Sequence, residues 1–151
     1  MKTFVLDWKR TLYDPDGRRL VDGASELLEL LEQKGVRLVL VGKGSREMHE
    51  EVDRLGVRRY FEHINFIDGS KHPALFEPFV DPDSPADTIF VGDRVRSELA
   101  AGKDLGATTV WIRQGRFASE EPESPAGRPG HVFASLKELK QFLERSRLLA
   151  D

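Results

Sequence analysis

Residues 3–12 have the sequence TFVLDWKRTL, in which a short apolar run ends at a single carboxylate, Asp7. Such a run is typical of a buried parallel strand, whose C-terminal end presents the next side chain to solvent. In open α/β sheets, ligands bind at the carboxyl ends of the strands. The pattern therefore predicts that Asp7 lies at the edge of the sheet where a ligand would bind. The hydroxyl of Thr11 follows four residues later.

The composition indicates one soluble globular domain. The chain has 151 residues, of which 39% are hydrophobic and 32% charged, and its formal net charge is -3. No overall field therefore favours nucleic acid or an anionic membrane. The absence of Cys excludes disulfides, thiolate catalysis and zinc–thiolate sites. No segment approaches the about 20 apolar residues of a spanning helix. We expect a single cytoplasmic domain over residues 1–151, with no nucleic-acid or membrane partner.

Strand-like and helix-like segments alternate along the chain. The segments with strand character are 3–7, 36–41, 64–67, 88–91, 108–112 and 132–134. Those with helical character are 24–33, 45–55, 73–79, 96–105 and the segment that begins at Ser135. This alternation predicts an α/β fold, a three-layer sandwich with a mainly parallel, Rossmann-like sheet. Residues 114–130 are rich in Gly, Pro, Ser and Glu and indicate an irregular surface loop.

Four of the expected strand ends carry polar residues. In chain order, they are Asp7 with Thr11, then Gly42-Lys43-Gly44-Ser45, then Gly69-Ser70-Lys71, and finally Gly92-Asp93 with Glu98. The order of one carboxylate, one lysine and a later acidic pair resembles the haloacid dehalogenase (HAD) superfamily, most of whose members are Mg²⁺-dependent phosphatases. The segment 135–139, SLKEL, is also similar to the tail of that family.

The resemblance covers nearly the whole chain and implies a HAD-like fold without a cap domain. About 25 residues separate Thr11 from the second strand, and about 20 separate Lys71 from Asp93, so neither gap can hold a cap. In this family an open site often goes with macromolecular substrates or with oligomers that cover the site. The resemblance thus leaves an oligomer open.

The resemblance also implies roles for the residues at the strand ends. Asp7 would be the nucleophile and a Mg²⁺ ligand, and Lys71 would steady the nucleophile and the phosphoryl oxygens. Asp93 would be the second metal carboxylate, Glu98 would orient the metal shell, and the backbone carbonyl of Lys9 would be the third protein ligand. An Asp nucleophile forms an acyl phosphate, and a metal with a lysine neutralises the anionic phosphoryl group.

The phosphate-binding residues implied by the same resemblance are Thr11, Gly42, Lys43 and Lys71. Plainer interpretations stand beside these roles. Lys71 could be a solvated surface lysine, Asp93 could cap the following helix, and Thr11 could start a turn. Trp8 and Phe117 could contact a partner, although Trp8 could also pack under a small flap after the first strand.

The first and second motifs depart from the family pattern. Lys9 stands where the phosphatases carry a second Asp, the general acid and base, and Arg10 replaces the usual Gly. A lysine, with an ordinary pKa of about 10.4, donates a proton but is a poor base at neutral pH. Gly42 replaces the usual Thr or Ser of the second motif. Ser45 could substitute for that hydroxyl or cap the next helix.

These departures leave two main interpretations open. One is a HAD-type phosphatase that is weak because Lys9 replaces the general acid and base. The other is a catalytically inactive relative that binds an anion or a protein partner. Both predict an unusually cationic pocket with weakened metal affinity, formed by Lys9, Arg10, Lys43, Lys71 and Arg94. A response-regulator receiver is disfavoured, because Asp7 is not followed by a second acid. Dehalogenase chemistry is disfavoured by the missing cap.

Overall fold

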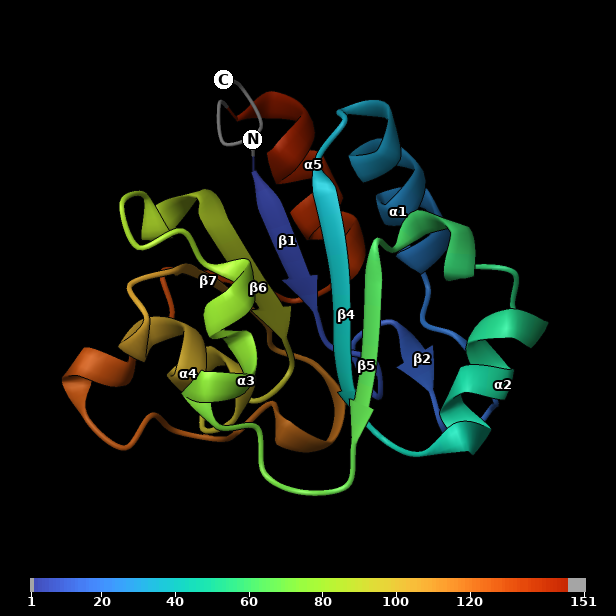
Figure 1. The fold of residues 1–151 in the computed structure, drawn as a ribbon, viewed down its shortest axis with the longest axis horizontal. Helices are drawn as coiled ribbons and strands as arrows, with labels where there is room; N and C mark the ends of the chain where they lie inside the picture. Colours follow the sequence, from blue (N-terminus) through green and yellow to red (C-terminus); the bar gives the residue numbers. More distant parts are fainter. Residues whose placement is uncertain (1, 147–151) are drawn as a thin grey trace.

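Six strands form one sheet in the order β5-β4-β1-β6-β7-β8, in which every adjacent pair is parallel (Figure 1). The computed structural model describes residues 2–146, so the expected domain limits at residues 1 and 151 lie outside the described part. The strands are β1 (Thr3–Leu6), β4 (Arg37–Lys43), β5 (His63–Ile67), β6 (Thr88–Gly92), β7 (Thr108–Ile112) and β8 (His131–Phe133). The α/β fold expected from the alternation of segments is confirmed.

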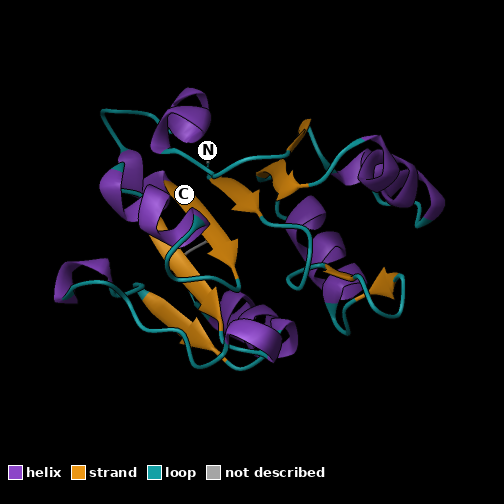
Figure 2. Cartoon of the chain, turned by 90° about the horizontal axis from the view of Figure 1, so that it is seen from below, coloured by secondary structure: helices purple, strands orange, loops and turns teal. Residues whose placement is uncertain are grey.

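Helices cover both faces of this sheet, because successive strand side chains point to opposite faces. Phe4 and Leu6 of β1 belong to a core shared with three helices, α1 (Ala24–Gln33), α2 (Arg46–Arg54) and α5 (Leu136–Arg145). Val5 belongs to a second core, shared with α3 (Pro73–Phe76) and α4 (Glu98–Asp104). The strands of Figure 1 point downward, and Figure 2 shows the molecule from below, facing the carboxyl ends of the strands. Helices lie on either side of the sheet in this view.

The last helix begins where the sequence predicts it. Ser135 is the N-cap of α5, and its side-chain oxygen accepts a hydrogen bond from the backbone N–H of Glu138. The carboxylate of Glu138 accepts in turn from the backbone N–H of Ala134. These reciprocal bonds satisfy backbone donors that a helix start otherwise leaves unpaired.

Some boundaries differ from the sequence prediction. β4 continues through Gly42 and Lys43, which were expected in a loop, because they pair with Phe66 and Ile67 of β5. The helix expected over 96–105 begins only at Glu98. The helical segment expected over 73–79 divides into α3 and a 3-10 turn over Glu77–Phe79. Pairing with neighbouring strands is a tertiary effect that local composition does not reveal.

A small hairpin lies beyond the carboxyl end of β1. Its strands, β2 (Tyr13–Asp14) and β3 (Arg19–Leu20), pair antiparallel, where the sequence predicts only a turn. Trp8 is fully buried and stacks on Tyr13, with ring centroids 5.1 Å apart and planes 4° from parallel. Trp8 therefore packs within the core, and it is not available to contact a partner.

No cap domain interrupts residues 2–146. Between β1 and β4 the chain forms only the hairpin and α1, and between β5 and β6 it forms only α3 and short 3-10 turns. None of the helices in this part of the chain has the length and apolar character that crossing a bilayer requires.

Candidate active site

The candidate site lies where the chain order of the sheet reverses. Strands β4 and β5 extend from one side of β1, and β6, β7 and β8 extend from the other. Asp7 directly follows β1 and Asp93 directly follows β6, and the backbone N–H of Asp7 donates to the carbonyl of Val91 over 3.0 Å. Ligands of open parallel sheets bind at such a switch point. Both carboxylates therefore lie at the edge where a ligand is expected.

Lys71 reaches this edge from the segment that follows β5. Its Nζ donates to Oδ1 of Asp7 over 2.5 Å and to the carbonyl oxygen of Val41 over 3.1 Å, and it lies 3.6 Å from Oε2 of Glu98. Only 3% of the Lys71 side chain is exposed, so it is not a solvated surface lysine. Burial by itself lowers the pKa of Lys71, but the charges of Asp7 and Glu98 outweigh burial and raise it. The lysine is therefore a charged ammonium within the site.

Three buried carboxylates form the acidic part of the site. Asp7, Asp93 and Glu98 each offer an oxygen, and these oxygens lie within 4.8 Å of one another. Burial, followed by the charge of Asp7, raises the pKa of Asp93 to about 8 and that of Glu98 to about 7. Oδ2 of Asp93 is buried and has no hydrogen-bond partner among the described residues. Clustered carboxylate oxygens with a free lone pair fit a hard divalent cation such as Mg²⁺.

Gly92 makes room for Glu98 in this cluster. A Cβ atom at Gly92 would lie 2.0 Å from Oε1 and 2.7 Å from Cδ of Glu98. No side chain fits in that space, so the Gly-Asp pair at the end of β6 has a steric reason. The N-cap of α4 is Ser97, so Asp93 does not cap that helix.

The site opens into a cavity of about 210 Å³ that contains all the expected cations. The cavity is lined by Asp7, Lys9, Arg10, Lys43, Lys71, Asp93, Arg94, Ser97, Glu98 and Phe117. Arg94 is ion-paired with Glu120, Nη2 to Oε2 3.0 Å. Lys9, Arg10 and Lys43 form no ion pair with any residue in 2–146. Their uncompensated charge makes the cavity mouth attractive to an anion.

Three residues that the sequence analysis considered for phosphate binding, Thr11, Gly42 and Ser45, do not line this cavity. Thr11 is fully buried, and its Oγ1 donates to Oδ2 of Asp7 over 3.2 Å. Gly42 faces Trp8 instead, because a Cβ there would lie 2.8 Å from Cβ of Trp8. Ser45 precedes α2, but its side chain accepts no capping hydrogen bond. Thr11 thus orients the nucleophile candidate, and Gly42 allows close packing.

The loop over residues 114–130 contributes more than the sequence predicts. It contains two 3-10 turns, Gly115–Phe117 and Pro125–Gly127, within otherwise irregular structure. Phe117 borders the cavity, with its ring centroid 4.3 Å from the guanidinium carbon of Arg94. Glu120 anchors the loop by accepting from Arg94 and from the backbone N–H of Arg96. The sequence predicts only an irregular surface loop here, and no pattern in the chain indicates the role of Glu120.

Known proteins resemble this chain in sequence and in fold. The HAD-hydrolase-like family model matches residues 69–139. A glyceraldehyde 3-phosphate phosphatase from Pyrococcus furiosus is 31% identical over 134 residues, which are 84% of this chain and 55% of the relative. The family model that this chain matches is thus that of the HAD-like hydrolases. The chain spans about half the length of the curated relatives it matches.

Solved HAD structures share the fold. A HAD phosphatase from Thermococcus onnurineus superimposes with a TM-score of 0.75 at 17% identity, over 97% of this chain and 100% of that one. The HAD-hydrolase YfnB from Bacillus subtilis, whose structure contains magnesium, gives a TM-score of 0.68 at 23% identity. That match covers 85% of this chain and 57% of YfnB. At these identities the structures establish the fold.

Proposed function

We propose that the protein is a HAD-type phosphohydrolase that takes a phosphoryl group from a phosphomonoester onto Asp7. The observation that carries the proposal is the buried contact of 2.5 Å between Lys71 and Asp7, beside the carboxylates of Asp93 and Glu98. The phosphatase from Pyrococcus furiosus supports a phosphorylated substrate. An oligomer remains a prediction, as does a cytoplasmic location.

Asp7 is held in place for nucleophilic attack. Lys71 donates to one of its carboxylate oxygens and Thr11 donates to the other. A bond forms between a carboxylate oxygen and phosphorus while the bond from phosphorus to the leaving oxygen breaks, which gives an aspartyl phosphate. Water then hydrolyses this acyl phosphate, releasing phosphate and restoring Asp7. Lys9 and Lys43 offer charge to the phosphoryl oxygens at the cavity mouth.

The acidic cluster suits a bound Mg²⁺. Asp7, Asp93 and the backbone carbonyl of Lys9 would hold the ion, and Glu98 would orient its shell. When bound, the ion neutralises charge on the phosphoryl oxygens. With all groups ionised, three carboxylates and one ammonium have a net charge of -2, which one divalent cation balances.

Lys9 is the reason why we expect slow hydrolysis. An ammonium can give a proton to the leaving oxygen, but at neutral pH it does not take one from water. Loss of general acid or base catalysis costs about 10²- to 10⁴-fold in rate. A second candidate function, anion binding without turnover, is favoured by Lys9 and by the uncompensated cations of the cavity.

The decisive experiment measures hydrolysis of 4-nitrophenyl phosphate, with and without Mg²⁺, by the parent, Asp7→Asn and Lys9→Asp. We expect slow Mg²⁺-dependent turnover by the parent and none by Asp7→Asn. We expect Lys9→Asp to be faster by about 10²-fold or more. Asp104→Asn, a change at an exposed carboxylate outside the cavity, is the matched control. If neither the parent nor folded Lys9→Asp turns over substrate, the hydrolase proposal fails and the anion-binding alternative is favoured.

A further inference from the structure

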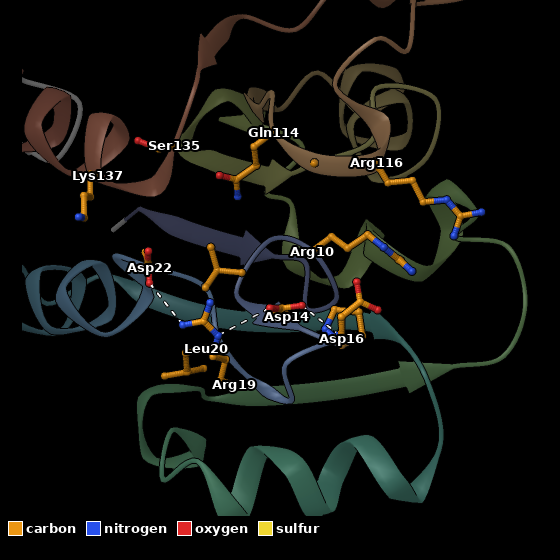
Figure 3. A pocket seen from close by; sticks show the side chains of 13 residues that line it. Arg10, Asp14, Asp16, Arg19, Leu20, Asp22, Gln114, Arg116, Ser135 and Lys137 are labelled. Atoms are coloured by element: carbon orange, nitrogen blue, oxygen red, sulfur yellow. Dashed lines mark hydrogen bonds and ion pairs between the residues drawn. The ribbon is translucent and has the colours of Figure 1, made fainter.

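A second and larger cavity adjoins the candidate active site. It has a volume of about 650 Å³ and lies between the β2–β3 hairpin, residues 114–116 and the start of α5 (Figure 3). We call it the side groove; the residues that matter below are Arg10, Asp14, Asp16, Arg19, Arg116 and Lys137. Arg10 lines both this groove and the cavity that contains Asp7. The two hollows therefore meet at Arg10.

The side groove has an excess of uncompensated positive charge. Arg19 lies 3.8 Å from Asp14 and 4.0 Å from Asp22, so this one cation is shared by two carboxylates (Figure 3). Arg116 and Lys137, like Arg10, form no ion pair within residues 2–146. Among the lining carboxylates, Asp16 alone has no ion-pair partner in the described chain. Four cations therefore line the groove against three carboxylates, which is a net excess of one positive charge.

The backbone of Arg10 is strained in a way that points to a role for its side chain. Its φ is 65°, in the left-handed region that glycine adopts without penalty. A side chain there brings Cβ too close to the following carbonyl oxygen, and such strain often marks functional positions. The ring of Phe117 lies 5.9 Å from the guanidinium carbon of Arg10 and 5.5 Å from that of Arg116. Phe117 therefore keeps both cations near the junction of the two cavities.

We propose that the side groove binds the leaving group of the substrate, and that this leaving group carries a second anionic group such as a carboxylate or a further phosphate. The inference rests on the proposed function, in which the reacting phosphoryl group lies at Asp7. The groove is within the range of about 300–1,000 Å³ that small-molecule sites occupy. The preferred substrate is therefore a phosphomonoester with an anionic leaving group of substantial size.

The first test compares two substrates that differ mainly in charge, 4-carboxyphenyl phosphate and 4-carbamoylphenyl phosphate. Arg116 and Lys137 are exposed, and contacts of exposed charges are weak, so we expect kcat/KM to favour the carboxylate by only about tenfold. Arg116→Gln with Lys137→Gln should bring this ratio near one. Arg128→Gln with Lys140→Gln, from the same loop and helix but outside the groove, should leave the ratio unchanged. Added salt should reduce the parent's ratio.

Arg10→Gly gives a second signature. Removing the side chain relieves the left-handed backbone, so we expect the variant to resist urea better than the parent while its preference for the carboxylate falls. A residue with only a structural role would not show both changes. Greater stability with an unchanged substrate ratio would argue against the inference.

Calorimetric binding of the same two compounds to Asp7→Asn separates the inference from the proposed function. Preferential binding of the carboxylate without hydrolysis by the parent would support the groove and overturn the hydrolase. Hydrolysis of both compounds at equal kcat/KM would support the hydrolase and overturn the groove. Neither binding nor hydrolysis would overturn both.

Discussion

Nζ of Lys71 lies 2.5 Å from Oδ1 of Asp7, although 64 residues separate them in the chain. Both side chains are buried, and the same ammonium lies 3.6 Å from Oε2 of Glu98. Lys71 therefore compensates two carboxylates from different elements, one at the end of β1 and one at the start of α4. We expect both the stability and the chemistry of the site to depend on this contact.

Lys71→Met should remove the charge that balances the acidic cluster. We expect a loss of about 3–5 kcal/mol in the free energy of unfolding at pH 7 without metal, because one partner of a buried ion pair is left uncompensated. Urea unfolding followed by circular dichroism measures this loss. Lys103→Met, at an exposed lysine of α4, should change it by no more than about 0.5 kcal/mol. If Asp7→Asn with Lys71→Met is no more stable than Lys71→Met alone, the ion pair is not the cause.

Mg²⁺ should stabilise the folded protein if the acidic cluster binds it. A ligand at 100 times its Kd stabilises by about 2.7 kcal/mol, which for a chain of this size raises Tm by about 5–10 °C. Asp93→Asn should lose most of this rise, because it removes one of the clustered carboxylates. Asp104→Asn should keep it. Differential scanning calorimetry with and without Mg²⁺ measures the shift, and an equal rise in Asp93→Asn would place the ion elsewhere.

Gly92→Ala should disturb Glu98. The new methyl group would overlap Oε1 of Glu98 at 2.0 Å, so the carboxylate has to move out of the cluster. Overpacking of this kind costs typically about 1–3 kcal/mol, and we expect the thermal shift with Mg²⁺ to fall as well. Gly69→Ala is the control, since a Cβ there meets nothing within 4 Å. Equal stability and equal Mg²⁺ shifts in the two variants would contradict the steric role of Gly92.

Glu51 should make the free energy of unfolding depend on pH in the acidic range. Hydrogen bonds from Arg54, Arg18 and Tyr13 lower the pKa of Glu51 to about 2, from an ordinary value of 4.5. The folded state therefore holds the proton less tightly than the unfolded state, so this stabilisation is complete above pH 4.5 and is lost as pH falls towards 2.

The measurement is the urea midpoint of the parent and of Glu51→Gln from pH 7 to pH 3. Glu51→Gln should be less stable at pH 7, and the difference should shrink below pH 4.5. Glu47→Gln, an exposed neighbour one turn earlier in α2, should track the parent throughout. A difference that stays constant with pH would mean that the charge of Glu51 is not what stabilises the network.

The sequence by itself determined where the strands lie along the chain and which polar residues follow them. Apolar runs and the residues that terminate them are local features, and the carboxyl ends of parallel strands meet at one edge of the sheet. This is why the positions of Asp7, Lys71 and Asp93 could be predicted together. The hairpin of β2 and β3 could not be predicted, because strands of two residues are too short to show a period.

Only the tertiary structure decided which side chains face the cavity and which charges remain free. Thr11 donates to Asp7 and Gly42 packs on Trp8, although the sequence assigned both to phosphate. Glu120 neutralises Arg94, whereas Arg10, at the junction with the side groove, forms no ion pair with any residue in 2–146. Side-chain direction and long-range ion pairing depend on neighbours that lie far away in the chain. Local residue patterns therefore locate this site, while packing across the sheet determines its charge and shape.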